Sequence, residues 1–201
     1  ETRPYKSRKS DSYDYSKALG EQIMLQLSKG APEVVVLRPS SVVGPYDFKP
    51  SEMGKALIDF YREKIPALPE GGYDFTDVRD VAKAIINAID KGKSGEVYLL
   101  SGKYYTLKEM ASLVKMVTGK KVPKIVIPYW LLKLSLPLIH LYSKITGAAP
   151  VFTLASLKAL RYGHPNMNHT KAKQQLGYSN RPMVETLRDF YEWQRLNKVI
   201  S

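Results

Sequence analysis

A tyrosine and a lysine stand four residues apart near the start of the chain, in the segment Tyr13-Asp14-Tyr15-Ser16-Lys17. If this segment is helical, one turn separates the two side chains, which then share a face with Cβ atoms about 5–6 Å apart. A phenol has a pKa of about 10 and is mostly protonated at neutral pH, and a nearby ammonium favours the phenolate form. The spacing therefore predicts a pair that can exchange a proton with a bound substrate.

The elements that would position this pair follow an α/β order. An apolar repeat of Leu19, Ile23 and Leu27 predicts a helix that begins at Ser12. Residues 34–37 are continuously apolar, which predicts a strand buried on both faces. Further strands are predicted at 73–75 and 96–100, and the helix between them is expected to bury a stripe made of Val78, Val81, Ala82, Ile85, Ile86 and Ile89. Strand, helix, strand in this order indicates a parallel sheet.

Helices dominate the second half of the chain. Thr106 and Glu109 have the spacing of a capping box, in which each side chain accepts a hydrogen bond from a backbone amide at the start of a helix. Other helices are predicted at 52–62, 129–145, 154–160, 171–176 and 184–196, and a short strand at 124–127. The segment 125–142 is unusually apolar, and either a ligand pocket or the core of a small domain would account for it.

Composition removes several classes of function. The 201 residues carry a formal charge of +12 and contain no cysteine, so neither a thiol nucleophile nor an iron–sulfur cluster is available. The lysines are interspersed singly with apolar residues, which favours a solvated surface or an anionic small molecule over a nucleic acid. The first residues lack the apolar run of a signal peptide, and we expect a cytoplasmic location.

Four segments in order resemble the extended short-chain dehydrogenase/reductase superfamily, in its dihydroflavonol-reductase-like and 3β-hydroxysteroid-dehydrogenase-like branch. Residues 13–21 resemble the Tyr-x-x-x-Lys catalytic helix, and residues 36–45 the strand and turn beneath the nicotinamide. Residues 74–82 resemble the re-entry into the Rossmann domain, and residues 171–178 the closing helices. The resemblance implies an α/β fold: the C-terminal part of a Rossmann-like parallel sheet with a mostly helical substrate-binding subdomain.

The resemblance also implies roles for individual residues. Tyr13 would be the general acid/base, and Lys17 would contact the nicotinamide ribose and favour the phenolate. The turn that lines NAD or NADP would consist of Pro39, Ser40, Ser41 and Val42, and the substrate contacts would include Tyr46 and Arg181. For Arg38 we favour an ion pair with a carboxylate at a helix end. Arg79 and Asp80 are expected to brace their helix rather than touch a ligand.

The chain departs from the family at its start. None of its 13 glycines forms the Gly-rich turn that binds the cofactor pyrophosphate, and the strand with the catalytic Ser or Thr is missing. We therefore expect a C-terminal portion that is inactive alone. Residues 1–45 and 73–102 would form the remaining Rossmann-like part, and residues 46–72 and 103–201 the substrate-binding subdomain.

The function expected from the resemblance is NAD(P)-dependent reduction or oxidation of an apolar or mixed carbonyl or alcohol. The alternatives are a sugar-nucleotide epimerase or dehydratase, in which Arg181 could serve the diphosphate, and a cofactor-free binding module. His140, His164 and His169 lack the spacing of a metal site. The expected partner is a small molecule; a homodimer is an alternative, and contact of the apolar segment with a membrane surface, Lys133 and Lys144 at the headgroups, is less favoured.

Overall fold

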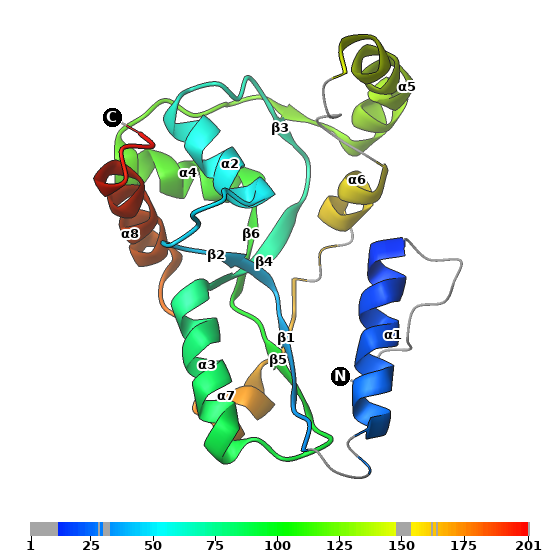
Figure 1. The fold of residues 1–201 in the computed structure, drawn as a ribbon. Coiled ribbons are helices and arrows are strands. Elements are labelled where there is room, and N and C mark those ends of the chain that lie inside the picture. The colour runs from blue at the N-terminus through cyan, green and yellow to red at the C-terminus, as the bar shows by residue number, and fades with distance from the viewer. Residues whose placement is uncertain are drawn as a thin grey trace.

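The computed structural model describes residues 12–27, 29, 33–147, 154–161, 163 and 165–200. Its helices and strands alternate along the first half of the chain, and helices prevail along the second, as Figure 1 shows. The helices are α1 (Ser12–Leu27), α2 (Glu52–Tyr61), α3 (Val78–Lys91), α4 (Leu107–Thr118), α5 (Tyr129–Thr146), α6 (Leu154–Arg161), α7 (Thr170–Leu176) and α8 (Met183–Leu196). The strands are β1 (Val36–Pro39), β2 (Ser41–Val43), β3 (Leu68–Pro69), β4 (Gly72–Asp77), β5 (Val97–Leu100), β6 (Lys103–Thr106) and β7 (Val126–Ile127).

The strands form short ladders that are mostly parallel. β1 pairs with β5 in parallel, with Val36 opposite Val97, and β3 pairs with β7 in parallel. β4 is parallel to β2 and antiparallel to β6. The predicted α/β class with parallel strands is therefore confirmed.

The first strand differs from its prediction in position and in burial. β1 begins at Val36 instead of 34, and its residues are half-buried except for Pro39, which is exposed. Among the described residues its ladder has one partner, β5, and α1 buries none of its own side chains. The strand is less buried than predicted because little of the described chain covers it.

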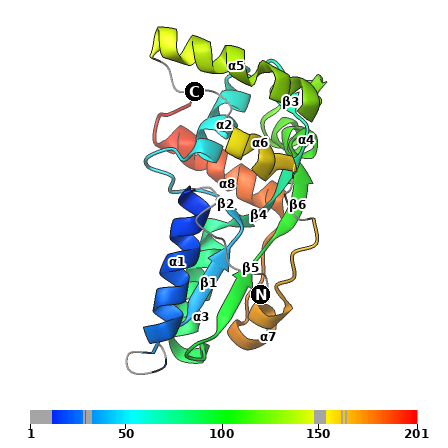
Figure 2. The same ribbon diagram turned by 90° about the vertical axis from the view of Figure 1, so that its right-hand side faces the viewer.

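Three apolar clusters form the core of the described residues: a small one between α5 and α6, and two larger ones. The larger lies between α2, α4, α8 and β4, and its fully buried members include Leu57, Phe75, Met110, Leu187 and Phe190. The smaller joins α3, β5 and α7 through Val81, Ala84, Tyr98, Leu100 and Leu176. Figure 2 shows the same division along the long axis of the molecule, with α3 and α7 at one end and α2, α4 and α5 at the other.

The prediction of which face of α3 is buried is wrong for most of the stripe. The helix buries Val81, Ala84 and Ala88, whereas Ile85, Ile86 and Ile89 are 51%, 63% and 79% exposed. Small side chains allow the helix to lie close to β5 and α7, and the larger isoleucines point away from both. Within the described part of the chain, most of the large apolar side chains of α3 therefore lie on the surface.

The capping box at α4 is confirmed. The Thr106 hydroxyl accepts a hydrogen bond from the Glu109 amide at 3.1 Å, and the Glu109 carboxylate accepts one from the Thr106 amide at 2.8 Å. Three strands were not predicted, namely β2, β3 and β6, because they have two to four residues and no alternating pattern. They are stabilised by pairing with distant segments, which local sequence does not reveal.

Candidate active site

Tyr13 and Lys17 lie on one face of α1, in its first two turns. The ammonium nitrogen of Lys17 is 5.6 Å from the centroid of the Tyr13 ring, and the tyrosine is 67% exposed. A cation at this distance interacts favourably with the ring, and the exposed phenol is accessible to a ligand. The geometry therefore permits proton exchange between the Tyr13 hydroxyl and a bound ligand.

The first turn of α1 lies at the level where β1 passes into β2 (Figures 1 and 2). Helix and strand are joined by an ion pair in which both Nε and Nη2 of Arg38 donate to the Glu21 carboxylate, the former at 2.8 Å. Arg38 is therefore the partner of a helix carboxylate, as predicted, but that carboxylate lies in the interior of α1 and not at a helix end. The pair fixes α1 relative to the strand whose carboxyl end carries the predicted cofactor turn.

The predicted cofactor turn crosses from β1 to β2. The Ser40 amide donates to the Leu100 carbonyl at 3.2 Å, which fixes the backbone, while the Ser40 hydroxyl is buried and has no hydrogen-bond partner among the described residues. A buried hydroxyl without a partner is costly. Pro39 is exposed and Ser41 is half-buried, and the role of this turn in cofactor binding stays a prediction.

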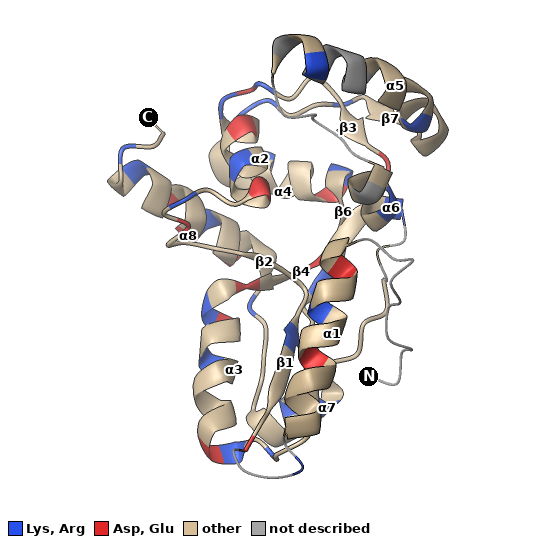
Figure 3. Ribbon diagram, turned by 45° about the vertical axis from the view of Figure 1, so that its right-hand side comes forward, with Lys and Arg blue, Asp and Glu red and all other residues tan. Residues whose placement is uncertain are grey.

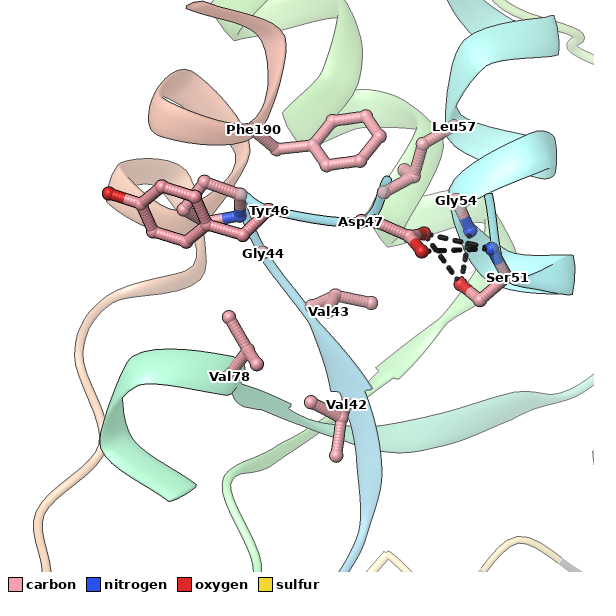
Figure 4. Close-up of a pocket in the computed structure, with 11 residues that line it drawn as sticks. Val42, Val43, Gly44, Tyr46, Asp47, Ser51, Gly54, Leu57, Val78 and Phe190 are labelled. Carbon is pink, nitrogen blue, oxygen red and sulfur yellow. Dashed lines mark hydrogen bonds between the residues drawn. The ribbon is translucent and has the colours of Figure 1, made fainter. Parts of the chain in front are cut away.

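A mainly apolar pocket of about 240 Å³ begins at the end of this turn. Val42, Val43 and Val78 form one wall, and Leu57 and Phe190 form the opposite one (Figure 4). Its polar group is the Asp47 carboxylate, which accepts hydrogen bonds from the amide and the hydroxyl of Ser51, both at 2.9 Å. Tyr13 and Lys17 are not among the residues that line it.

Two glycines allow the chain to close around this pocket. A Cβ atom at Gly44, whose φ is +145°, would lie 2.8 Å from Cγ1 of Val78. A Cβ atom at Gly54 would lie 2.1 Å from Oδ2 of Asp47. A side chain at Gly44 would displace Val78 and would also adopt a φ that favours glycine, and a side chain at Gly54 would displace the Asp47 carboxylate.

Tyr46 lies at the edge of the pocket with a φ of +71°. Such a conformation is unfavourable for a residue with a side chain and is often found at functional sites. Its ring is 6.3 Å from that of Trp193, and Phe48 is 5.1 Å from the same indole. In Figure 4 the Tyr46 hydroxyl points away from Asp47 and Leu57, so its predicted contact with substrate stays a prediction.

Arg181 lies in an ion-pair network instead of lining this pocket. Its amide and its guanidinium Nη2 both donate to the Asp80 carboxylate at 2.8 Å, and Nη1 is 3.5 Å from Glu185. The buried Asp77 is held by Arg79, whose Nη2 donates to Oδ2 at 2.7 Å and whose Nη1 reaches Asp189 at 2.5 Å. The network joins the start of α3 to α8, so Arg79 and Asp80 brace their helix as predicted.

Asp77 makes this network sensitive to acid. Burial raises the pKa of its carboxyl, but hydrogen bonds from Arg79 outweigh burial and hold the pKa below its ordinary value. The unfolded chain therefore binds this proton more readily than the native protein. We expect the contribution of Asp77 to the free energy of unfolding to be complete above the unfolded pKa of about 3.9 and to decline as the pH falls toward the lower native value. Urea unfolding across this pH range measures it, and an Asp77→Asn variant should show a flatter profile.

A second polar network lies beside the smaller core and was not predicted. The Tyr178 hydroxyl is 2.6 Å from Oγ1 of Thr76 and 3.1 Å from the Ser101 carbonyl, and the Ser101 hydroxyl is 3.1 Å from Nδ1 of His169. Burial raises the pKa of Tyr178 to about 12. Thr76 and Ser101 are fully buried, which makes this network a structural brace instead of a reaction centre.

No cluster of three or more His, Asp or Glu side chains in the described part of the chain has the geometry to hold a metal ion. His164 and the side chain of His140 lie outside the described residues. The residues that sequence reasoning missed at the pocket are Asp47, Ser51 and Phe190. Phe190 reaches the pocket from α8, more than a hundred residues away in sequence, and no local pattern marks it.

The comparisons with known proteins agree with this arrangement. The model of the NAD dependent epimerase/dehydratase family matches residues 1–101. The chain is 34% identical over 117 residues to "Sterol demethylase protein B" of Methylococcus capsulatus, covering 58% of this chain and 35% of that protein. It is 28% identical over 201 residues to "3beta-hydroxysteroid-dehydrogenase/decarboxylase isoform 1" of Arabidopsis thaliana, covering 89% of this chain and 44% of that one.

Among solved structures, "Crystal structure of gox2253" matches with a TM-score of 0.77 and 30% identity, covering 94% of this chain and 57% of that one. The chain therefore spans about half of this structure, and 35% and 44% of the two curated relatives. The family model covers half of the sequence, including the Tyr13 helix, the β1–β2 turn and β5. On these grounds the chain belongs to the NAD dependent epimerase/dehydratase family.

Proposed function

We propose that this chain is the C-terminal portion of an NAD(P)-dependent reductase or dehydrogenase that acts on an apolar or mixed carbonyl or alcohol. The observation that carries the proposal is the placement of Tyr13 and Lys17, exposed and side by side, at the level of the β1–β2 turn. An exposed phenol paired with an ammonium is suited to give a proton to a carbonyl oxygen or to take one from an alcohol.

The residues that would hold the nicotinamide belong to the turn and the α1 face. The buried Ser40 hydroxyl would pair with a polar edge of the ring, Ser41 and Val42 would lie beneath it, and Lys17 would donate to the ribose. The cofactor, when bound, supplies or accepts the hydride. Tyr13 would hold the carbonyl oxygen through its hydroxyl and transfer the proton from the same atom.

The substrate class follows from the pocket beside the turn. Its walls are valine, leucine and phenylalanine side chains, and its Asp47 carboxylate is hydrogen-bonded to Ser51. A pocket of this kind favours a ligand with a large apolar surface. The names of the two curated relatives, which refer to a sterol and to a 3β-hydroxysteroid, support the same class. We assign residues 46–72 and 103–201 to substrate binding and residues 1–45 and 73–102 to the cofactor side.

We propose further that a preceding nucleotide-binding segment completes the sheet and that the 201 residues alone do not turn over. The support is apolar surface on both sides of β1: Ile23 and Leu27 on α1 are 48% and 53% exposed, and Ile86 and Ile89 on α3 are exposed to a greater extent. Contiguous apolar surface of this kind is typical of faces that pack against another segment. A cytoplasmic location stays part of this proposal.

The natural gene product tests both parts of the proposal. We expect an intact mass well above 22.7 kDa and oxidation of NADH or NADPH in the presence of a steroid ketone, with no turnover of a UDP-sugar. The isolated 201-residue chain is the matched control and should be inactive. A natural mass near 22.7 kDa would refute the missing segment, and turnover of the UDP-sugar alone would favour the epimerase alternative. Arg181 does not support the epimerase alternative, because its guanidinium forms an ion pair with Asp80 and does not offer a site for a diphosphate.

A further inference from the structure

Helix α5 is apolar on two opposite faces. One face packs on the small cluster with α6, where Leu132 is buried and Tyr129 and Leu136 are half-buried. The other face, which we name the α5 outer face, is exposed and consists of Trp130 (65%), Leu131 (42%), Leu134 (70%), Leu138 (70%) and Ile145 (76%). At 3.6 residues per turn these five side chains fall within an arc of about 100°.

The outer face has a consistent electrostatic setting. Lys133 and Lys144 are exposed, and their helical positions lie on one side of the arc. The sequence of α5 contains no acidic residue, and Figure 3 shows blue and no red in the part of α5 that it colours. The sequence between Met110 and Val184, which runs from α4 to α7, contains eleven Lys and Arg residues and no Asp or Glu.

We propose that the α5 outer face docks the protein onto an anionic lipid surface. A helix that presents leucines and a tryptophan on one side, with lysines beside them, lies in the plane of a bilayer with its apolar face among the acyl chains. Lysines beside the face attract anionic headgroups. None of the helices in the described ranges is long and apolar enough to cross a bilayer, so the proposed contact is peripheral.

Charge favours lipid over a second copy of the chain as the occupant. Two copies joined through this face would bring together Lys133 and Lys144 of both, and α5 itself has no acidic residue to offset them. The Glu70 carboxylate lies at the start of α5, where it accepts a hydrogen bond from the Tyr129 amide at 3.0 Å. An anionic bilayer supplies the opposite charge and an apolar interior together. In Figures 1 and 2, α5 lies at the end of the molecule opposite α7, so a flat surface can approach it without meeting α3 or β1.

Vesicle sedimentation of the natural gene product tests the proposal without reference to catalysis. We expect binding to vesicles of phosphatidylcholine with an equal amount of phosphatidylserine, and about tenfold weaker binding to phosphatidylcholine alone or in about 0.5 M NaCl. The double variant Leu134→Ser/Leu138→Ser should lower the partition coefficient at least about tenfold. Its matched control is Met116→Ser/Leu196→Ser, at positions 71% and 75% exposed on α4 and α8, which should bind as the parent does.

A second pair of variants separates charge from apolar contact. Lys133→Glu/Lys144→Glu should weaken binding to the anionic vesicles about tenfold, whereas Lys83→Glu/Lys91→Glu on α3 should have a much smaller effect. Absence of binding to anionic vesicles, or equal effects of the α5 variants and their controls, would overturn the proposal. It would also be overturned if ultracentrifugation showed a dimer that Leu134→Ser/Leu138→Ser dissociates, with no vesicle binding by the parent chain.

Discussion

Replacing Tyr13 by phenylalanine in the natural gene product is expected to lower turnover about 10²–10⁴-fold, with little change in cofactor binding. The substitution removes one hydroxyl from a side chain that is 67% exposed, and it retains the ring beneath the Lys17 ammonium. Folding should therefore be unaffected, and the loss would report the missing proton donor. Steady-state kinetics together with a fluorescence titration of NADPH measure the two quantities separately.

The matched control for this variant is Tyr15→Phe. Tyr15 lies on the same helix but about 200° around it, and it is more buried than Tyr13. It should retain turnover within a small factor of the parent protein. Unaltered turnover of Tyr13→Phe would remove the catalytic assignment, and equal losses in both variants would indicate a general disturbance of α1.

The second large effect is expected at Arg79, whose replacement by methionine should lower the free energy of unfolding by about 3 kcal/mol. The Asp77 carboxylate is fully buried and receives three hydrogen bonds from Arg79, one from its amide and two from its guanidinium. Loss of the guanidinium leaves a buried charge that the Arg79 amide, the Thr186 side chain and Arg181, with Nε at 3.6 Å, offset in part. Removal of one partner of a buried pair is far costlier than loss of an exposed charge.

Urea unfolding of Arg79→Met and of Arg188→Met provides the comparison. Arg188 is exposed on α8, next to Asp189, and its replacement should change the free energy of unfolding by less than about 0.5 kcal/mol. If both variants were equally stable, the network between α3 and α8 would contribute nothing measurable. A loss in the free energy of unfolding for Arg79→Met alone would establish that the network braces α3 against α8, the helices that carry Val78 and Phe190 to the pocket.

The sequence was sufficient for features determined by neighbours along the chain. The capping box at Thr106 and Glu109, the helix that brings Tyr13 and Lys17 to one face, and the order of helices in the second half follow from local spacing. Each depends on contacts within one or two turns, which periodicity and side-chain type encode directly.

Features that depend on distant segments were not predictable. Which face of α3 is buried depends on how closely β5 and α7 approach the helix. The sequence pattern therefore predicted that three isoleucines are buried, whereas the helix buries Val81 and two alanines. The pocket depends on Phe190, which comes from α8. The location of the Arg181 side chain depends on its ion pair with Asp80, which lies on α3. A pattern along one helix specifies an apolar face, but not which neighbour covers it.

The most direct test of the central claim is a crystal structure of the natural gene product with NADP⁺ and a steroid alcohol. We predict that the Tyr13 hydroxyl lies within hydrogen-bond distance of the substrate oxygen, that Lys17 contacts the nicotinamide ribose, and that Ser40 donates to or accepts from the carboxamide. A nicotinamide bound away from the β1–β2 turn, or a Tyr13 hydroxyl directed to solvent with the substrate oxygen held by another group, would contradict the account.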